Sequence, residues 1–156
     1  VTYFFRYNET KVYPIGEVPD FPESSTCLFA GDGSITAKMR LEVLQTWWAP
    51  AIWRLNDRDS LQMENQTAYV PYDDWNTSVL LSDLPLFALK DQGSGTTVAT
   101  SGSRVTFLET DNRHWLKLET ESGVGGWIYL NDFSTILVNG EERQTTEFFE
   151  GLSFAD

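Results

Sequence analysis

One cysteine and one histidine, Cys27 and His114, are the only residues of their types in this chain. A thiol beside an imidazole can act as a nucleophile with its base, so they define one enzymatic hypothesis, a small hydrolase using His114 with Cys27 or a carboxylate. Neither residue has neighbours typical of a nucleophile or of a group that orients a base, so we favour a buried thiol and a surface imidazole. A single cysteine excludes an internal disulfide, and a single histidine excludes the paired-imidazole sites of zinc hydrolases.

Carboxylates and glycines supply little further catalytic chemistry. Asp73-Asp74 would suit a carboxylate pair or a calcium site, but calcium needs several converging oxygens, and we interpret this pair as a turn. Gly31-Asp32-Gly33-Ser34 and Gly93-Ser94-Gly95 are too short to cradle a nucleotide phosphate and also indicate turns. We therefore expect no enzymatic activity, no metal and no cofactor.

Aromatic side chains are the residues best suited to binding, and the chain has 6 Trp, 6 Tyr and 10 Phe. An exposed ring can stack on a peptide or on the face of a sugar. Trp47 and Trp48 are adjacent, so on an extended chain they point to opposite sides and one should be exposed; the alternative is that both are buried. The candidate ligand-binding residues are Trp47, Trp48, Tyr72, Trp75 and Tyr129.

Strands must position these side chains. Short runs of Val, Ile, Leu, Thr and aromatic residues alternate with turn residues along the chain, and several runs alternate apolar with polar residues. Such alternation is typical of a strand with one buried face. We predict an all-β fold with strands at residues 40–44, 52–55, 68–71, 104–108, 115–118 and 126–129.

Two segments of the chain resemble each other in order and spacing. Residues 28–30, 39–46, 53–55 and 69–75 match residues 86–88, 103–110, 115–118 and 127–133. The extra residues fall between the predicted strands, as expected for loops on a fixed scaffold, so we infer an internal duplication. Four aromatic residues recur at matched positions and are expected in the core: Trp53, Tyr69, Trp115 and Trp127.

The duplication divides the chain into four parts. Residues 1–20 form an N-terminal hairpin, residues 21–76 the first copy, residues 77–135 the second copy and residues 136–156 an acidic C-terminal extension. The hairpin is expected to turn near Asn8-Glu9. In the extension, Asn139-Gly140 predicts a hairpin turn, and residues 145–151 predict a capped helical turn stopped by glycine.

The second copy resembles the bacterial SH3 (SH3b) domain family. A strand at residues 104–108 is followed by Trp115-Leu116-Lys117-Leu118 and by a glycine-containing turn that leads into Gly126-Trp127-Ile128. This order is similar to the family signature of a valine-rich strand, W-x-x-V and G-x-x-G-W-[VI]. The resemblance covers about residues 78–135, and the first copy matches less well, with Ala68-Tyr69-Val70 at the tryptophan position.

This resemblance implies a fold, a location and a class of function. The fold would be two tandem small SH3-like barrels. The location would be extracytoplasmic in a bacterium, and the function would be that of an interaction module which recognises peptidoglycan or a peptide.

The net charge of the chain restricts the classes of partner that it can bind. With 11 Lys and Arg against 23 Asp and Glu, the net charge is −12. This charge repels nucleic acid, anionic lipid, teichoic acids and acidic peptides, and it suits a cationic or neutral partner. No run of residues approaches the roughly 18 apolar residues of a membrane-spanning helix.

We therefore expect a non-catalytic binding module, secreted or lipid-anchored at the bacterial cell surface. It would recognise a cell-envelope peptide or a protein partner through an aromatic groove, as a monomer or weak oligomer. Residues 1–5 lack the basic stretch and cleavage site of a signal peptide, so we expect a leader already removed. Two alternatives are a small cell-wall hydrolase using His114, and a structural extracellular subunit whose aromatic surfaces another chain covers.

Overall fold

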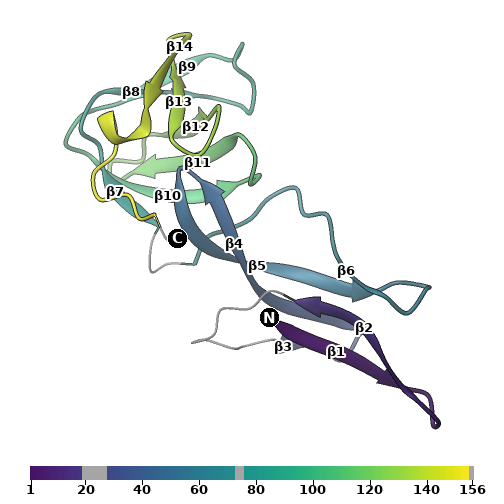
Figure 1. Cartoon of the computed structure of the whole chain (residues 1–156). Helices are drawn as coiled ribbons and strands as arrows, with labels where there is room; N and C mark the ends of the chain where they lie inside the picture. Colours follow the sequence, from purple (N-terminus) through teal and green to yellow (C-terminus); the bar gives the residue numbers. More distant parts are fainter. Residues whose placement is uncertain (19–27, 73–75, 155–156) are drawn as a thin grey trace. The chain divides into compact units, whose positions relative to one another are not determined.

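The computed structural model describes residues 1–18, 28–72 and 76–154 of the chain. These residues form strands and loops with one short helical turn, so the predicted all-β fold is confirmed (Figure 1). The chain divides into two compact units. Unit 1 comprises Val1–Met39 and Ala49–Gln66, and unit 2 comprises Arg40–Trp48 and Thr67–Asp156.

The N-terminal hairpin of unit 1 is formed as predicted. Strand β1 (Thr2–Tyr7) pairs antiparallel with β2 (Val12–Val18), with a bulge between Phe4 and Phe5. At the turn, the Asn8 side-chain oxygen accepts a hydrogen bond from the Lys11 N–H at 3.0 Å, and Glu9 adopts a left-handed φ of 72°. An Asn side chain that bonds to the backbone in this way stabilises a turn.

A second sheet has the order β3-β4-β5-β6. Its strands are β3 (Leu28–Phe29), β4 (Ser34–Val43), β5 (Gln45–Leu55) and β6 (Leu61–Met63). Gly16 lets β2 approach β6, because a Cβ at this position would lie 2.8 Å from the Cβ of Leu61. The buried side chains of unit 1 include Val18, Ile35, Ala37, Ala49, Ala51 and Trp53, so the core position predicted for Trp53 is confirmed.

Strands β4 and β5 each contribute residues to both units. A single residue, Leu44, connects them, with a left-handed φ of 72°. The tip of this hairpin, Arg40–Trp48, belongs to unit 2. It adds four buried apolar side chains to that unit: Leu41, Val43, Leu44 and Trp47.

Unit 2 contains a six-stranded antiparallel sheet in the order β7-β10-β11-β12-β8-β9 (Figure 1). Its strands are β7 (Thr77–Val79), β8 (Leu84–Phe87), β9 (Thr96–Ala99), β10 (Arg104–Thr110), β11 (Trp115–Thr120) and β12 (Gly125–Tyr129). One face of the sheet supplies core side chains with at most 1% exposure: Leu84, Leu86, Val105, Phe107, Leu116, Leu118 and Ile128.

The hairpin tip is packed into the core of unit 2 through Trp47. The Trp47 ring contacts that of Phe107 edge-on with centroids 5.5 Å apart, and Phe107 contacts Phe149 at 5.7 Å. The Thr46 N–H donates to the Ser153 carbonyl at 2.8 Å. The tip is therefore held by both ring packing and a backbone hydrogen bond.

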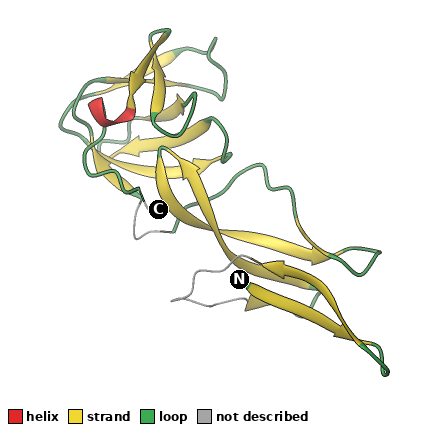
Figure 2. Cartoon of the chain, in the orientation of Figure 1, coloured by secondary structure: helices red, strands yellow, loops and turns green. Residues whose placement is uncertain are grey.

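The C-terminal extension contains both predicted features. Strand β13 (Thr135–Val138) pairs with β14 (Glu141–Gln144) around Asn139 and Gly140, whose φ angles are 51° and 81°. Positive φ at both central residues is typical of a tight hairpin turn. The helical turn is the 3-10 turn η2 (Thr145–Glu147), red in Figure 2, and Gly151 follows with a φ of 70°.

The strand boundaries of the two matched segments agree in part. Both segments begin with a strand, β3 in the first and β8 in the second. Leu44 reverses the chain between β4 and β5, whereas the matching Leu108 lies at a bulge inside the continuous strand β10. Tyr69 forms an isolated bridge to Thr110, whereas the matching Trp127 lies within β12. The tandem SH3-like barrels stay a prediction.

Candidate ligand-binding face

Strands β8, β11 and β12 of unit 2 carry half-buried rings on the side of the sheet opposite its core. On β11, Leu116 and Leu118 are fully buried, so Trp115 and Lys117 must point to the other face. The same alternation on β12 buries Ile128 and leaves Trp127 and Tyr129 half-buried. We call this surface the aromatic face; its residues are Phe87, Lys90, His114, Trp115, Lys117, Trp127 and Tyr129.

Four rings of the aromatic face, those of Phe87, Trp115, Tyr129 and His114, contact one another in a continuous series. Trp115 lies directly opposite Tyr129 in the sheet, with centroids 5.1 Å apart at 75°. Phe87 packs edge-on against Trp115 at 5.8 Å. His114 stacks on Tyr129 at 5.2 Å with 20° between the ring planes. Edge-to-face and offset contacts of this kind hold rings in defined positions, which suits a binding surface.

A tight loop fixes the position of His114. The Asp111 Oδ1 accepts hydrogen bonds from the N–H groups of Arg113, His114 and Trp115 at 2.9–3.0 Å. The Leu130 N–H donates to the His114 carbonyl at 2.7 Å, and the His114 Nδ1 lies 2.9 Å from the Leu130 carbonyl oxygen. Because a carbonyl oxygen only accepts, Nδ1 carries the hydrogen of this bond.

Two glycines of the segment that resembles the SH3b signature have separate structural roles. Gly123 has a φ of 83°, which a turn requires and other residues rarely adopt. Gly126 has no such angle, but a Cβ there would lie 2.7 Å from the Leu86 Cβ and 2.8 Å from the Phe87 carbonyl oxygen. The absence of a side chain therefore lets β12 and β8 approach, and Trp127 pairs with Phe87.

Two lysines place their ammonium groups over the ring of Trp127. The Nζ atoms of Lys90 and Lys117 lie 4.6 and 5.7 Å from its centroid. Lys117 is directly opposite Trp127 in the sheet, and Lys90 follows β8. Both distances are within the range of a cation–π interaction.

The structure places the predicted ligand-binding residues in different surroundings. Trp47 is 1% exposed and lies in the core, as in the burial alternative. Trp48 is half-buried, and its carbonyl accepts a hydrogen bond from the Tyr72 N–H at 2.9 Å. Tyr72 is 38% exposed, and burial raises the pKa of its phenol. Tyr129 belongs to the aromatic face, and Trp75 lies outside the described residues.

Sequence reasoning missed most of the aromatic face. Tyr69 is buried as predicted, but Trp115 and Trp127 are half-buried instead of lying in the core. The periodicity of the strands contained the signal, because Trp127 is two residues from Tyr129 and shares its side of β12. Trp115 is likewise two residues from Lys117, whose charge favours solvent.

The residues considered for catalysis or metal binding have mainly structural contacts where they are described. Cys27 and Asp73-Asp74 lie outside the described residues. Asp132, which matches Asp74 in the second copy, accepts hydrogen bonds from the N–H groups of Ser134 and Thr135, both at 2.8 Å, and these bonds lower its pKa. Within residues 1–18, 28–72 and 76–154, no group of three His, Cys, Asp or Glu side chains is placed to hold a metal ion.

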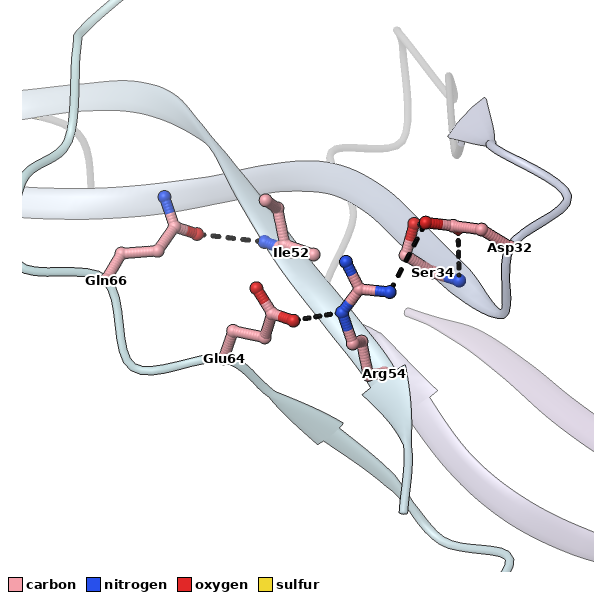
Figure 3. Close-up of polar contacts among 6 residues, drawn as sticks. All are labelled: Asp32, Ser34, Ile52, Arg54, Glu64 and Gln66. Atoms are coloured by element: carbon pink, nitrogen blue, oxygen red, sulfur yellow. Dashed lines mark hydrogen bonds and ion pairs between the residues drawn. The ribbon is translucent and has the colours of Figure 1, made fainter.

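A network of exposed charges lies in unit 1 (Figure 3). Asp32 accepts hydrogen bonds from the hydroxyl and from the N–H of Ser34, the latter at 2.9 Å, and its other oxygen lies 3.3 Å from Arg54. These bonds, chiefly those from Ser34, lower the pKa of Asp32 to about 2. Arg54 also pairs with Glu64. The predicted turn at residues 31–34 is therefore formed, with φ of 82° and 84° at its glycines.

In the same part of unit 1, the segment that follows β6 is hydrogen-bonded to β5. The Gln66 Oε1 accepts a hydrogen bond from the Ile52 N–H at 2.9 Å (Figure 3). The Glu64 N–H donates to the Ile52 carbonyl at 2.7 Å. These contacts satisfy backbone groups and neutralise Arg54, so we interpret the network as structural.

An apolar hollow of about 310 Å³ also lies in unit 1. Ile15, Ile35, Leu55 and Leu61 line it, and Phe29 stands at its wall with 67% exposure. A ligand site normally combines an apolar wall with several convergent polar groups. The aromatic face of unit 2 has both rings and charges, so it is the stronger candidate.

Comparisons of this chain with models of protein families, with curated proteins and with solved structures give no match. In the part of the chain that the structure describes, no helix has the length and apolar character needed to cross a membrane.

Proposed function

We propose that this chain is a non-catalytic binding module that recognises a cell-envelope peptide of the peptidoglycan type through the aromatic face of unit 2. The observation that carries the proposal is the continuous series from Phe87 through Trp115 and Tyr129 to His114. All four side chains are exposed or half-buried; three lie on neighbouring strands, and the loop before β11 holds His114. Rings fixed in this way offer a large contact area without losing much rotamer freedom on binding.

Two further features support an extracytoplasmic binding role. The resemblance of residues 78–135 to bacterial SH3 domains implies this class of function, and the aromatic face lies within those residues. The net charge of −12 is consistent with solubility and with a partner that is not a polyanion. We propose a secreted or lipid-anchored location at the bacterial cell surface on the same grounds.

A titration with soluble peptidoglycan fragments tests this function. We expect the backbone and indole N–H resonances of Trp115 and Trp127 to shift, with smaller changes at Trp53 in the core of unit 1. Tyr129→Ala and Trp115→Ala should each weaken binding about tenfold, or roughly 1.4 kcal/mol, because each removes a ring from the contact surface.

Tyr3→Ala is the matched control for Tyr129→Ala. Tyr3 is 63% exposed on the N-terminal hairpin of unit 1, so its removal should leave fragment binding unchanged. Binding that survives both ring substitutions would contradict the assignment to the aromatic face. The hydrolase alternative predicts cleavage of the fragments that His114→Ala abolishes, whereas the binding module predicts intact fragments throughout.

One observation favours a second candidate function, that of a structural subunit covered by another chain. Tyr3, Phe5 and Tyr7 follow one side of β1 with 60–66% exposure, and Val12 lies opposite Tyr7. A row of exposed apolar side chains is typical of a protein interface. Light scattering tests this candidate: a stable oligomer that Phe5→Ser dissociates would support it, and a monomer would not.

A further inference from the structure

Lys90 and Lys117 bring two positive charges to one half-buried ring. Their Nζ atoms lie 4.6 and 5.7 Å from the Trp127 centroid, and they come from separate parts of the chain, the loop after β8 and the middle of β11. The Glu109 carboxylate lies 4.0 Å from the Lys90 Nζ, at the limit of an ion pair. The ring can offset only part of the repulsion between two ammonium groups.

Both lysines are positioned by backbone contacts. Lys117 is held in the β11–β12 ladder opposite Trp127. Lys90 lies in a loop closed by a hydrogen bond from the Ala88 N–H to the Gly95 carbonyl at 2.8 Å. Within that loop the Asp91 Oδ1 accepts from the Gly93 N–H, also at 2.8 Å. The two ammonium groups therefore converge on Trp127 without help from a ligand.

Glu109 is also directly opposite Lys117 in the sheet, so it offsets part of the positive charge of the two lysines. Two ammonium groups at one ring nevertheless contrast with the charge of the rest of the unit. Unit 2 has 6 Lys and Arg against 15 Asp and Glu, a net charge of −9. A polyanion would be repelled by that charge, but one carboxylate close to two ammonium groups gains local attraction that screening by salt does not fully remove. A Lys–carboxylate contact is also a strong, charge-assisted hydrogen bond.

We propose that Lys90 and Lys117 bind a carboxylate of the ligand, while the apolar part of the ligand next to that carboxylate packs on Trp127 and the neighbouring rings. The ligand is thus a peptide or wall fragment with a free carboxylate. This inference rests on the proposed function of the aromatic face and adds its charge requirement. It departs from the expectation of a cationic or neutral partner, because two lysines of an otherwise acidic unit would recognise a single negative group.

The test compares muropeptides that carry free stem carboxylates with the same muropeptides converted to amides. Wild-type protein should bind the carboxylate form at least fivefold more tightly at low salt, and 0.5 M NaCl should reduce this preference. Lys90→Gln and Lys117→Gln should each reduce the preference, and the double variant should bind both forms equally. Lys11→Gln removes a lysine of unit 1 and should change nothing.

The outcomes separate this inference from the proposed function. Equal binding of both forms by the wild type, or a preference that persists in the double glutamine variant, overturns the carboxylate site and leaves the binding module intact. Absence of binding to either form by the wild type overturns both proposals. The double glutamine variant could also fail to bind the amide form. In that case the double variant Lys90→Arg with Lys117→Arg is measured, because it keeps both positive charges. A retained preference for the carboxylate form supports the site, and a lost preference overturns it.

Discussion

Gly126 approaches Leu86 so closely that a Cβ at position 126 would lie only 2.7 Å from the Cβ of Leu86. Since real Cβ atoms essentially never come this close, a side chain at residue 126 would force strands β12 and β8 to move apart or shift. Their contact sets Phe87 opposite Trp127, and it therefore joins β8 to the aromatic face.

Gly126→Ala should consequently destabilise unit 2. The added methyl group would push against the Leu86 side chain and the Phe87 carbonyl oxygen, so we expect a loss of about 1–3 kcal/mol in the free energy of unfolding, as for other overpacked cores. Urea unfolding followed by tryptophan fluorescence measures this loss. Gly125→Ala is the control, because its Cβ would meet its neighbours at 3.4 Å, and a substitution there should be nearly neutral.

The loop before Trp115 depends on a single carboxylate. Asp111→Ala would leave the N–H groups of Arg113, His114 and Trp115 without their shared acceptor, so we expect a loss of about 1–2 kcal/mol in stability and faster amide exchange at His114. Asp111→Asn keeps a side-chain oxygen, so it should retain most of the stability and most of the protection of the His114 amide from exchange. An unchanged exchange rate at His114 in Asp111→Ala would show that the loop is held by other contacts.

The acid dependence of unit 1 should be visible at Asp32. Its pKa is about 2 in the folded chain, below the ordinary 3.8, so the carboxylate stabilises the fold above about pH 4. That stabilisation is lost as the pH falls through about 2. A titration of the Asp32 carboxyl carbon by NMR gives the midpoint directly.

Ser34→Ala and Arg54→Gln separate the two causes of this pKa. Ser34 is the larger one, so Ser34→Ala should raise the pKa of Asp32 more than Arg54→Gln does. The reverse order would mean that the guanidinium charge, and not the hydroxyl hydrogen bond, holds the carboxylate in its ionised form.

The sequence predicted the elements whose conformation depends on residues close together in the chain. The turn at Asn139-Gly140 follows from the left-handed φ angles that these two residue types tolerate, and the hairpin of β1 and β2 follows from its alternation and turn residues. The all-β class follows from the many short β-rich runs for the same reason.

The features that the sequence did not predict depend on packing between residues far apart in the chain. Leu44 adopts a left-handed φ, which a leucine rarely does, so the single-residue reversal between β4 and β5 has no residue signal. The tip of this hairpin then belongs to unit 2, where Trp47 meets Phe107. The recurrence of Trp115 and Trp127 at matched positions led to the prediction that both lie in the core. The strand periodicity, which places them on the aromatic face, was the better signal.

The burial of Trp47 leads to the last prediction. Its ring is 1% exposed and contacts Phe107, so Trp47→Ala should lower the stability of unit 2 by about 3–5 kcal/mol through lost contacts and a cavity. The Trp47 Nε1–H finds no hydrogen-bond acceptor among the residues that the structure describes. Trp47→Phe removes this unsatisfied donor and keeps most of the ring contact, so its loss should be much smaller.

Trp48→Ala provides the matched comparison, because this adjacent ring is only half-buried and its removal should cost less than that of Trp47. Chemical unfolding of the three variants gives the order of stability directly. If Trp47→Phe proved as damaging as Trp47→Ala, the indole N–H would have to make a stabilising hydrogen bond, and the contact with Phe107 would not account for the position of this residue in the core.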